Sequence, residues 1–108
     1  MRKFLSDFDV LACPVIGCAA GPVEEEFPLN VAGQPTTDYL DWLRFAFLAT
    51  TTGLPAISVP VGRTPDGIPV GLQMIGPPRG ETRLLQVAAF VERAVEWDSR
   101  PKDPVVRH

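Results

Sequence analysis

Two short stretches in which apolar residues alternate with small ones dominate the middle of the chain. The alternation runs over residues 57–62 and again over residues 68–75, and a period of two is typical of a strand with unlike faces. Residues 64–67, Thr-Pro-Asp-Gly, have turn chemistry, because proline presets φ and glycine accepts the φ > 0 position of a bulged hairpin. The pattern therefore predicts a β-hairpin.

The two faces of this hairpin differ in side-chain size. One face carries Ile, Val, Leu and Met, whereas the other has small residues at Ser58, Pro60, Gly62 and Gly71. A helix or another backbone can approach closely over such small residues. Pro60 has no N–H to donate, so we expect its strand to be an edge strand or to be interrupted there.

The apolar pattern also predicts a strand, a loop and a helix on either side of the hairpin. Residues 8–15 form a short apolar run that indicates a buried strand. Residues 17–36 are rich in glycine and proline and include the acidic run Glu-Glu-Glu, so we expect a solvated loop. Residues 81–97 have the clearest helical period. The apolar residues that cluster on one side, and are expected to face the core, are Leu84, Val87, Ala88, Val91, Ala94 and Val95. We expect residues 1–97 to form one piece of a domain and residues 98–108 to be a flexible tail.

A second helix is predicted over residues 38–49, ahead of the hairpin. Thr37 or Asp38 is the expected N-cap, and Gly53 is the expected C-terminal stop. One face of this helix carries Leu40, Leu43 and Phe47, and further apolar residues widen it beyond a single stripe. A helix this apolar requires cover on more than one side.

Composition narrows the class of protein. A chain of 108 residues with 45% hydrophobic and 21% charged residues is ordinary for one globular unit. The net charge of −3 and the scattered basic residues give no reason to expect nucleic-acid binding. The uncharged stretch 45–62 contains Gly53, Pro55 and Pro60, which interrupt a continuous helix, so we expect no membrane span.

The two cysteines indicate a compartment rather than a site. Cys13 and Cys18 have no histidine near them, which makes a poor zinc site, and no secretory signal precedes them. A disulfide between them requires a secreted protein. We therefore expect two reduced thiols in a cytoplasmic protein, with no metal and no cofactor.

Two segments of the hairpin region carry a family resemblance. Residues 53–62, Gly-Leu-Pro-Ala-Ile-Ser-Val-Pro-Val-Gly, and residues 66–77, Asp-Gly-Ile-Pro-Val-Gly-Leu-Gln-Met-Ile-Gly-Pro, closely resemble the C-terminal part of the amidase signature family. The likeness covers most of residues 8–97. The family includes bacterial amidases, cyclic-dimer hydrolases of nylon oligomers, fatty acid amide hydrolases and the A-type subunit of the glutamyl-tRNA amidotransferase. The resemblance implies an α/β fold in which strand 8–15 and the hairpin belong to a mixed β-sheet flanked by the two helices.

The resemblance also implies a chemistry whose centre is missing here. Family members cleave amides with a serine nucleophile, a second serine that relays the proton and a lysine base, all upstream of the part matched. The serines and lysines of this chain are Ser6, Ser58, Ser99, Lys3 and Lys102, which include no serine pair. We therefore expect no catalytic residues, and interpret the chain as a C-terminal fragment of an amidase, from a truncated or split reading frame or a longer product, that is inactive alone.

What carries over from the family is the scaffold and part of a pocket. Cys13, Phe47 and Thr50 are candidates to face the acyl pocket of a complete enzyme, with core packing as the favoured role for each. Thr50 stands where many relatives have asparagine, which weakens a specific contact there. As partners we expect further copies of this chain or the missing N-terminal amidase portion. Two alternatives remain open: a non-catalytic oligomeric or partner-binding module, and a remnant of the A-type subunit of a glutamyl-tRNA amidotransferase.

Overall fold

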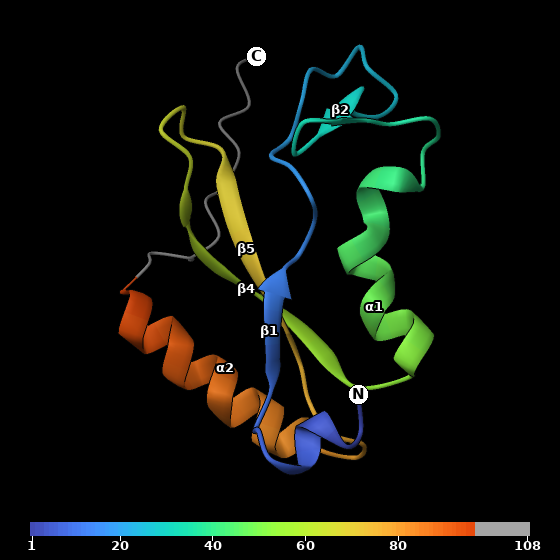
Figure 1. Ribbon diagram of the computed structural model, residues 1–108. Helices are drawn as coiled ribbons and strands as arrows, with labels where there is room; N and C mark the ends of the chain where they lie inside the picture. Colours follow the sequence, from blue (N-terminus) through green and yellow to red (C-terminus); the bar gives the residue numbers. More distant parts are fainter. Residues whose placement is uncertain (97–108) are drawn as a thin grey trace, which may run out of the picture.

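The computed structural model describes residues 1–96, so Trp97 and the predicted tail 98–108 lie outside the described part. Short 3₁₀ turns, five strands and two helices follow one another along the chain (Figure 1). In chain order they are η1 (Phe4–Ser6), β1 (Leu11–Pro14), β2 (Asn30–Val31), β3 (Gln34–Pro35), η2 (Asp41–Leu43), α1 (Arg44–Thr52), β4 (Ala56–Arg63), β5 (Pro69–Ile75) and α2 (Glu81–Val95).

The main sheet has three strands in the order β1-β5-β4, and both pairings are antiparallel. Ile75 at the end of the central strand lies opposite Leu11 on one side and Ala56 on the other. The described strands thus form a small antiparallel sheet, which with the two helices matches part of the expected α/β fold, although the resemblance implied a mixed sheet. β4 is an edge of this sheet and its register shifts between Pro60 and Gly62, which confirms the expectation for Pro60.

The predicted hairpin is present with the predicted turn. The Gly67 N–H donates to the Thr64 carbonyl at 2.8 Å, and the Thr64 N–H donates to the Ile68 carbonyl at 2.9 Å. Gly67 has φ = 86°, a conformation that glycine adopts without a Cβ clash. The Thr64 hydroxyl accepts a further hydrogen bond from the Ile68 N–H at 3.0 Å, so the loop closes with its own polar groups.

One face of the sheet packs against α2. The buried cluster there joins both hairpin strands to the helix, and its members are Val59, Met74, Leu84 and Ala88. Met74 is only 1% exposed, and burying a side chain of this size stabilises the fold by about 1.5–3 kcal/mol. The prediction that Leu84 and Ala88 face the core is confirmed, whereas Ala94 and Val95 near the end of α2 are exposed.

The opposite face of the sheet meets α1, so the two helices lie on opposite sides (Figure 1). Leu48 and Ala49 of α1 pack against a small cluster of Leu5, Leu54 and Ile75. The prediction of which face of this helix points inward is wrong in part, because Leu40 is 57% exposed and Phe47 is 38% exposed.

The limits of α1 also differ from the predicted 38–49. A 3₁₀ turn at Asp41–Leu43 comes first, and the helix then continues to Thr52. In its last turn the Thr51 and Thr52 hydroxyls donate to carbonyls of the preceding turn, at 3.0–3.1 Å. The predicted stop at Gly53 is confirmed, since this residue has φ = 62° and its N–H donates to the Ala49 carbonyl at 3.0 Å.

Residues 17–36, predicted to be loop, contain the two-residue strands β2 and β3. Ala32 and Gly33 between them both have positive φ, which is the geometry of a tight hairpin turn. The Gly33 N–H donates to the Asn30 side chain at 2.9 Å and closes the turn.

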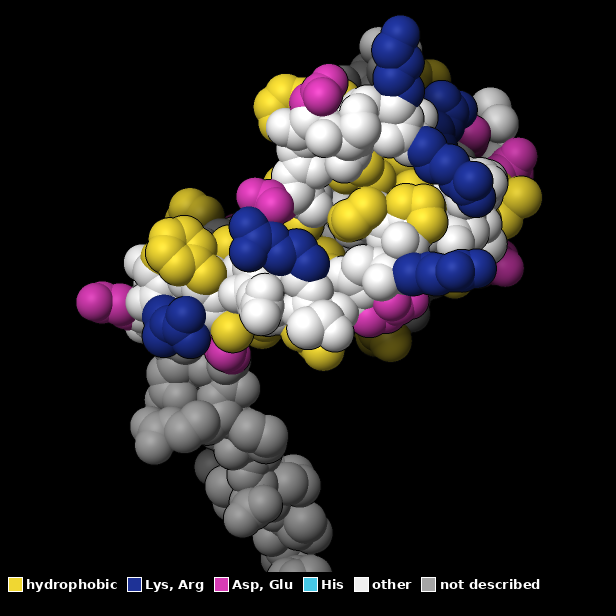
Figure 2. Space-filling view, turned by 90° about the horizontal axis from the view of Figure 1, so that it is seen from below, with side chains coloured by type: hydrophobic (Ala, Val, Ile, Leu, Met, Phe, Trp, Pro, Cys, Tyr) yellow, Lys and Arg dark blue, Asp and Glu magenta, His cyan; other side chains and the backbone are white. Residues whose placement is uncertain are grey.

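Hydrophobic side chains remain on the surface as well as in the core. Phe4 and Phe8 near η1 stack with ring centroids 4.6 Å apart, yet are 42% and 56% exposed. Leu85 and Phe90 on the outer side of α2 are 59% and 64% exposed. Figure 2 shows hydrophobic side chains gathered in the middle of one face, between basic and acidic ones.

Candidate functional site

A cavity of about 730 Å³ lies between the loop after β1 and the hairpin. The loop and the hairpin turn lie toward the same end of the sheet (Figure 1). The lining of the cavity is mostly apolar and comes from residues 14–22, 25–28 and 69–71, together with Trp42, Ser58 and Thr64. A hollow of this size is in the range of small-molecule pockets, about 300–1,000 Å³.

Two glycines let the walls of this cavity come together. A Cβ added at Gly71 would lie 2.9 Å from Val15 Cγ2 and 3.0 Å from Ser58 Oγ. A Cβ at Gly17 would lie 2.8 Å from Val31 Cγ1. The prediction that the small-residue face of the hairpin admits a close neighbour is therefore confirmed, and the neighbour at Gly71 is the residue following β1.

Trp42 supplies an aromatic wall of the cavity. Its ring packs edge-on to Tyr39 with centroids 5.7 Å apart, and Tyr39 packs edge-on to Phe27 at 6.4 Å. The Trp42 indole N–H is buried and has no hydrogen-bond partner among residues 1–96. No local pattern in the sequence indicates this arrangement, because Phe27 and Trp42 are distant in the sequence and both contact Tyr39 only in the folded chain.

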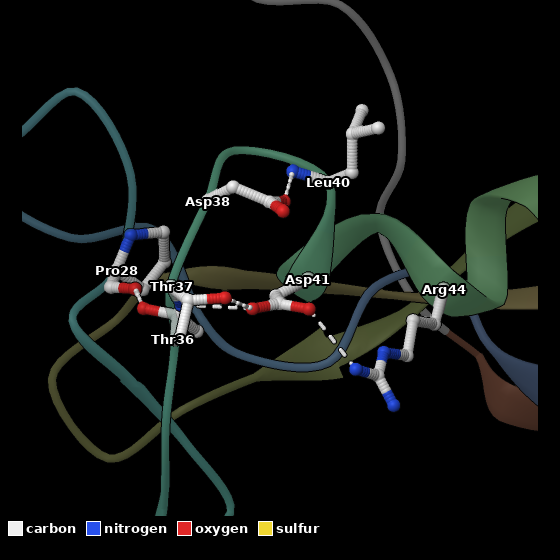
Figure 3. A network of polar contacts seen from close by, with 7 residues as sticks. All are labelled: Pro28, Thr36, Thr37, Asp38, Leu40, Asp41 and Arg44. Carbon is white, nitrogen blue, oxygen red and sulfur yellow. Dashed lines mark hydrogen bonds and ion pairs between the residues drawn. The ribbon is translucent and has the colours of Figure 1, made fainter.

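Asp41 holds the turn that carries Trp42 (Figure 3). Its carboxylate accepts hydrogen bonds from the N–H and hydroxyl of Thr37 at 2.8 and 3.0 Å and from the Arg44 guanidinium at 3.0 Å. These donors, the Thr37 N–H above all, lower the pKa of Asp41 to about 2. Asp38 instead accepts the Leu40 N–H at 2.8 Å, so the predicted caps at Thr37 and Asp38 are wrong. The adjacent Thr36 hydroxyl donates to the Pro28 carbonyl and ties this segment to the cavity loop.

Gln73 is a polar residue that the sequence interpretation did not single out. It lies on the small-residue face of β5 and is only 8% exposed. Its side-chain amide donates to the Phe45 carbonyl of α1 at 2.9 Å and to Cys13 Sγ at 3.3 Å. Gln73 could have been recognised as a polar residue within a predicted buried strand, because a buried side-chain amide requires a hydrogen-bond partner.

The three candidates for an acyl pocket lie on two elements, β1 and α1. Cys13 is half-buried on β1 beside Gln73, whereas Phe47 and Thr50 lie exposed on α1. None of the three lines the cavity described above.

The groups needed for serine catalysis are not assembled in the described residues. Ser6 is exposed and donates to the Lys3 carbonyl at 2.7 Å, and Ser58 lines the cavity. Within residues 1–96 the hydrogen bonds join no serine hydroxyl to a lysine amine. Ser99, Lys102 and His108 lie outside this part.

The described residues offer neither a metal site nor a membrane span. Among them no group of three or more His, Cys, Asp or Glu side chains is placed to hold a metal ion. No helix in residues 1–96 is long and apolar enough to cross a membrane.

Comparison with known proteins identifies the family. The family model described as Amidase matches residues 1–85. The chain therefore belongs to the amidase family, and the resemblance to the amidase signature enzymes is confirmed.

The relatives are much longer than this chain. The fatty acid amide hydrolase of Medicago truncatula is 44% identical over 97 residues, which are 86% of this chain and 16% of the relative. The acylamidase of Rhodococcus erythropolis is 37% identical over 105 residues, 95% of this chain and 22% of the relative. The A-type subunit of the glutamyl-tRNA(Gln) amidotransferase of Mesorhizobium japonicum is 38% identical over 91 residues, 84% of this chain and 17% of the relative.

Solved structures confirm the fold class. A bacterial aryl acylamidase of the amidase signature family superposes with a TM-score of 0.73 at 28% identity, over 93% of this chain and 22% of the other. The 6-aminohexanoate cyclic dimer hydrolase gives a TM-score of 0.71 at 29% identity, with 92% and 22% covered. The chain thus has the fold of one segment of these enzymes.

Proposed function

We propose that this chain is the C-terminal part of an amide-bond hydrolase, supplying scaffold and pocket wall, while the nucleophile, relay serine and base come from residues outside it. The observation that carries the proposal is the agreement with part of a larger aryl acylamidase, at a TM-score of 0.73 over 93% of this chain and 22% of the other. The three serines of this chain include no pair, so acyl transfer has no activated nucleophile here.

The pocket wall is proposed for Cys13, Phe47 and Thr50. α1 has no fully buried residue, and it presents Phe47 and Thr50 outward, away from the core of this chain. Such side chains are available to a neighbouring part of a complete enzyme. Cys13 is held by Gln73, so its thiol has a defined place on the α1 side of the sheet.

A chimera tests the scaffold and the wall together. This chain would replace the aligned segment of the Rhodococcus erythropolis acylamidase, and hydrolysis of an acyl p-nitroanilide would be followed. We expect activity, with a several-fold lower kcat/KM after Phe47→Ala and no loss after Phe90→Ala, which truncates an exposed aromatic on α2. A folded but inactive chimera, or equal loss from both substitutions, contradicts the proposal.

The isolated chain is expected to be inactive, and active-site labelling tests this directly. A fluorophosphonate probe reacts with activated serines, so it should label the bacterial aryl acylamidase but not this chain under the same conditions. Labelling or amide turnover that disappears after Ser58→Ala would overturn the expectation, because Ser58 is the one described serine that lines the cavity.

We further propose a cytoplasmic location, and as partners the N-terminal portion of an amidase or other copies of this chain. Free thiols at Cys13 and Cys18 agree with a reducing compartment. A second candidate is a remnant of the A-type subunit of an amidotransferase, supported by the 38% identity to the Mesorhizobium protein. A second chimera, with this chain in place of the aligned segment of the Mesorhizobium protein, compares the amidase and amidotransferase candidates. The host protein that recovers the larger share of its own activity is the closer relative of the parent of this chain.

A further inference from the structure

The cavity between the loop and the hairpin carries charge of one sign only. Glu25 and Glu26 belong to its lining, and no lysine, arginine or histidine does. Both glutamates are exposed to solvent. The ion pairs Asp41–Arg44 and Asp9–Arg83 involve neither of them. The charge of this lining therefore favours a cation.

Part of the cavity wall is aromatic. Phe27 and Trp42 both line the cavity. Tyr39 packs edge-on to each of them, with interplanar angles of 87° and 86°. Aromatic faces attract ammonium groups through the ring quadrupole, and the same faces cover the apolar part of such a ligand.

Size and charge together define a class of ligand. A volume of about 730 Å³ accepts a small organic molecule, and the mostly apolar lining favours a hydrocarbon or aryl body. We propose that this cavity binds small apolar amines in their protonated form, with the ammonium at Glu25 and Glu26 and the body against Phe27 and Trp42. A carboxylate on the same body is disfavoured, since it meets two like charges in the lining.

The site has a further meaning if the proposed function holds. Amide hydrolysis releases an acid and an amine, and this cavity matches the amine half. That step rests on the proposed function, whereas binding of an amine by the isolated chain does not. Failure of the proposed function and failure of amine binding are distinguishable. The chimera measures turnover, whereas an amine titration of the isolated chain measures binding alone.

The test is a titration of the ¹⁵N-labelled chain followed by NMR at pH 7. The probes are 2-phenylethylamine, 3-phenylpropionate and neutral 3-phenylpropionamide, which share a phenylethyl body and differ in charge. The Trp42 indole N–H and the Gly71 amide report on the cavity. A Trp97→Phe background identifies the Trp42 signal. We expect saturable shifts of both reporters with the amine, weaker shifts with the amide, and none with the carboxylate.

Matched variants distinguish a specific contribution of Glu25 and Glu26 from a general effect of nearby negative charge. Glu25→Gln and Glu26→Gln should each weaken amine binding about two- to fivefold, the effect of removing an exposed charge contact. Glu24→Gln alters the adjacent residue, which does not line the cavity, and should leave the affinity unchanged. The proposal is overturned if 3-phenylpropionate binds as well as the amine, if no probe gives saturable shifts, or if Glu24→Gln weakens binding as much as its neighbours. The spectrum of each variant reports whether it is folded.

Discussion

The side-chain amide of Gln73 on β5 donates a hydrogen bond of 2.9 Å to the main-chain carbonyl of Phe45 on α1. The two residues are 28 positions apart, and Gln73 is only 8% exposed. A buried side-chain hydrogen bond of this kind fixes one element against another and is costly to leave half made. It therefore orients α1, and with it the turn that carries Trp42.

Replacing Gln73 should loosen α1 in particular. We expect Gln73→Leu to lower the free energy of unfolding by about 1–2 kcal/mol, because the link to α1 is lost and a differently shaped side chain enters a packed site. Hydrogen exchange should accelerate in α1 more than in α2. The control is Gln86→Leu on the exposed side of α2, expected to change stability by less than about 0.5 kcal/mol. Uniform acceleration across both helices would contradict a specific role in holding α1.

What could be predicted from the sequence depended on how local the determining contacts are. The hairpin was predictable because Thr64 and Gly67 specify its turn from within a few residues. The start of α1 was not predictable from local sequence. The Asp41 carboxylate accepts a hydrogen bond from the Thr37 N–H, and the regular helix begins only at Arg44. The inward face of α1 was partly mistaken because Leu48 and Ala49, rather than Leu40, meet the sheet.

The candidate site was less predictable still. The cavity forms where the loop after β1 meets Gly71 and Trp42, residues that lie far apart in the chain. Neither the ring contacts of Tyr39 nor the partners of Gln73 leave a periodic signal. The resemblance identified the family, and the pocket residues that it implied remain a proposal.

The hairpin turn offers a direct test through Gly67, whose φ is 86°. We expect Gly67→Val to destabilise the fold by about 1–2 kcal/mol, because a β-branched residue is strained at positive φ. Gly62→Ala is the matched control, since a Cβ there meets nothing within 4 Å and its φ is not positive. Urea denaturation measures both. An unchanged midpoint for Gly67→Val would mean that the turn adopts another conformation in solution.

Asp41 should make stability depend on pH in the acid range. Its pKa is lowered from 3.8 to about 2 in the folded chain, first by the Thr37 N–H and then by Arg44. The ionised Asp41 carboxylate therefore stabilises the folded chain above pH 3.8, and this contribution is lost as the pH falls toward 2. Asp41→Asn should flatten that part of the stability profile, whereas Asp66→Asn in the hairpin turn should leave the Asp41 dependence in place. A carboxyl ¹³C titration of Asp41 with an ordinary midpoint would refute the network in solution.

The last prediction is that the isolated chain self-associates. β1 and β4 are the two edges of the described sheet, and edge strands recruit further strands. α1 has no fully buried residue, Phe45 is 40% exposed, and Trp42 is half-buried. We expect a homodimer or larger oligomer that buries Phe45, Trp42 or the β1 edge, because exposed apolar surface of this kind marks an interface. Sedimentation equilibrium at micromolar concentration measures the mass, and Phe45→Glu should shift it toward the monomer while Phe90→Glu on α2 should not. A well-folded species of 11.8 kDa would show that the chain closes its own core.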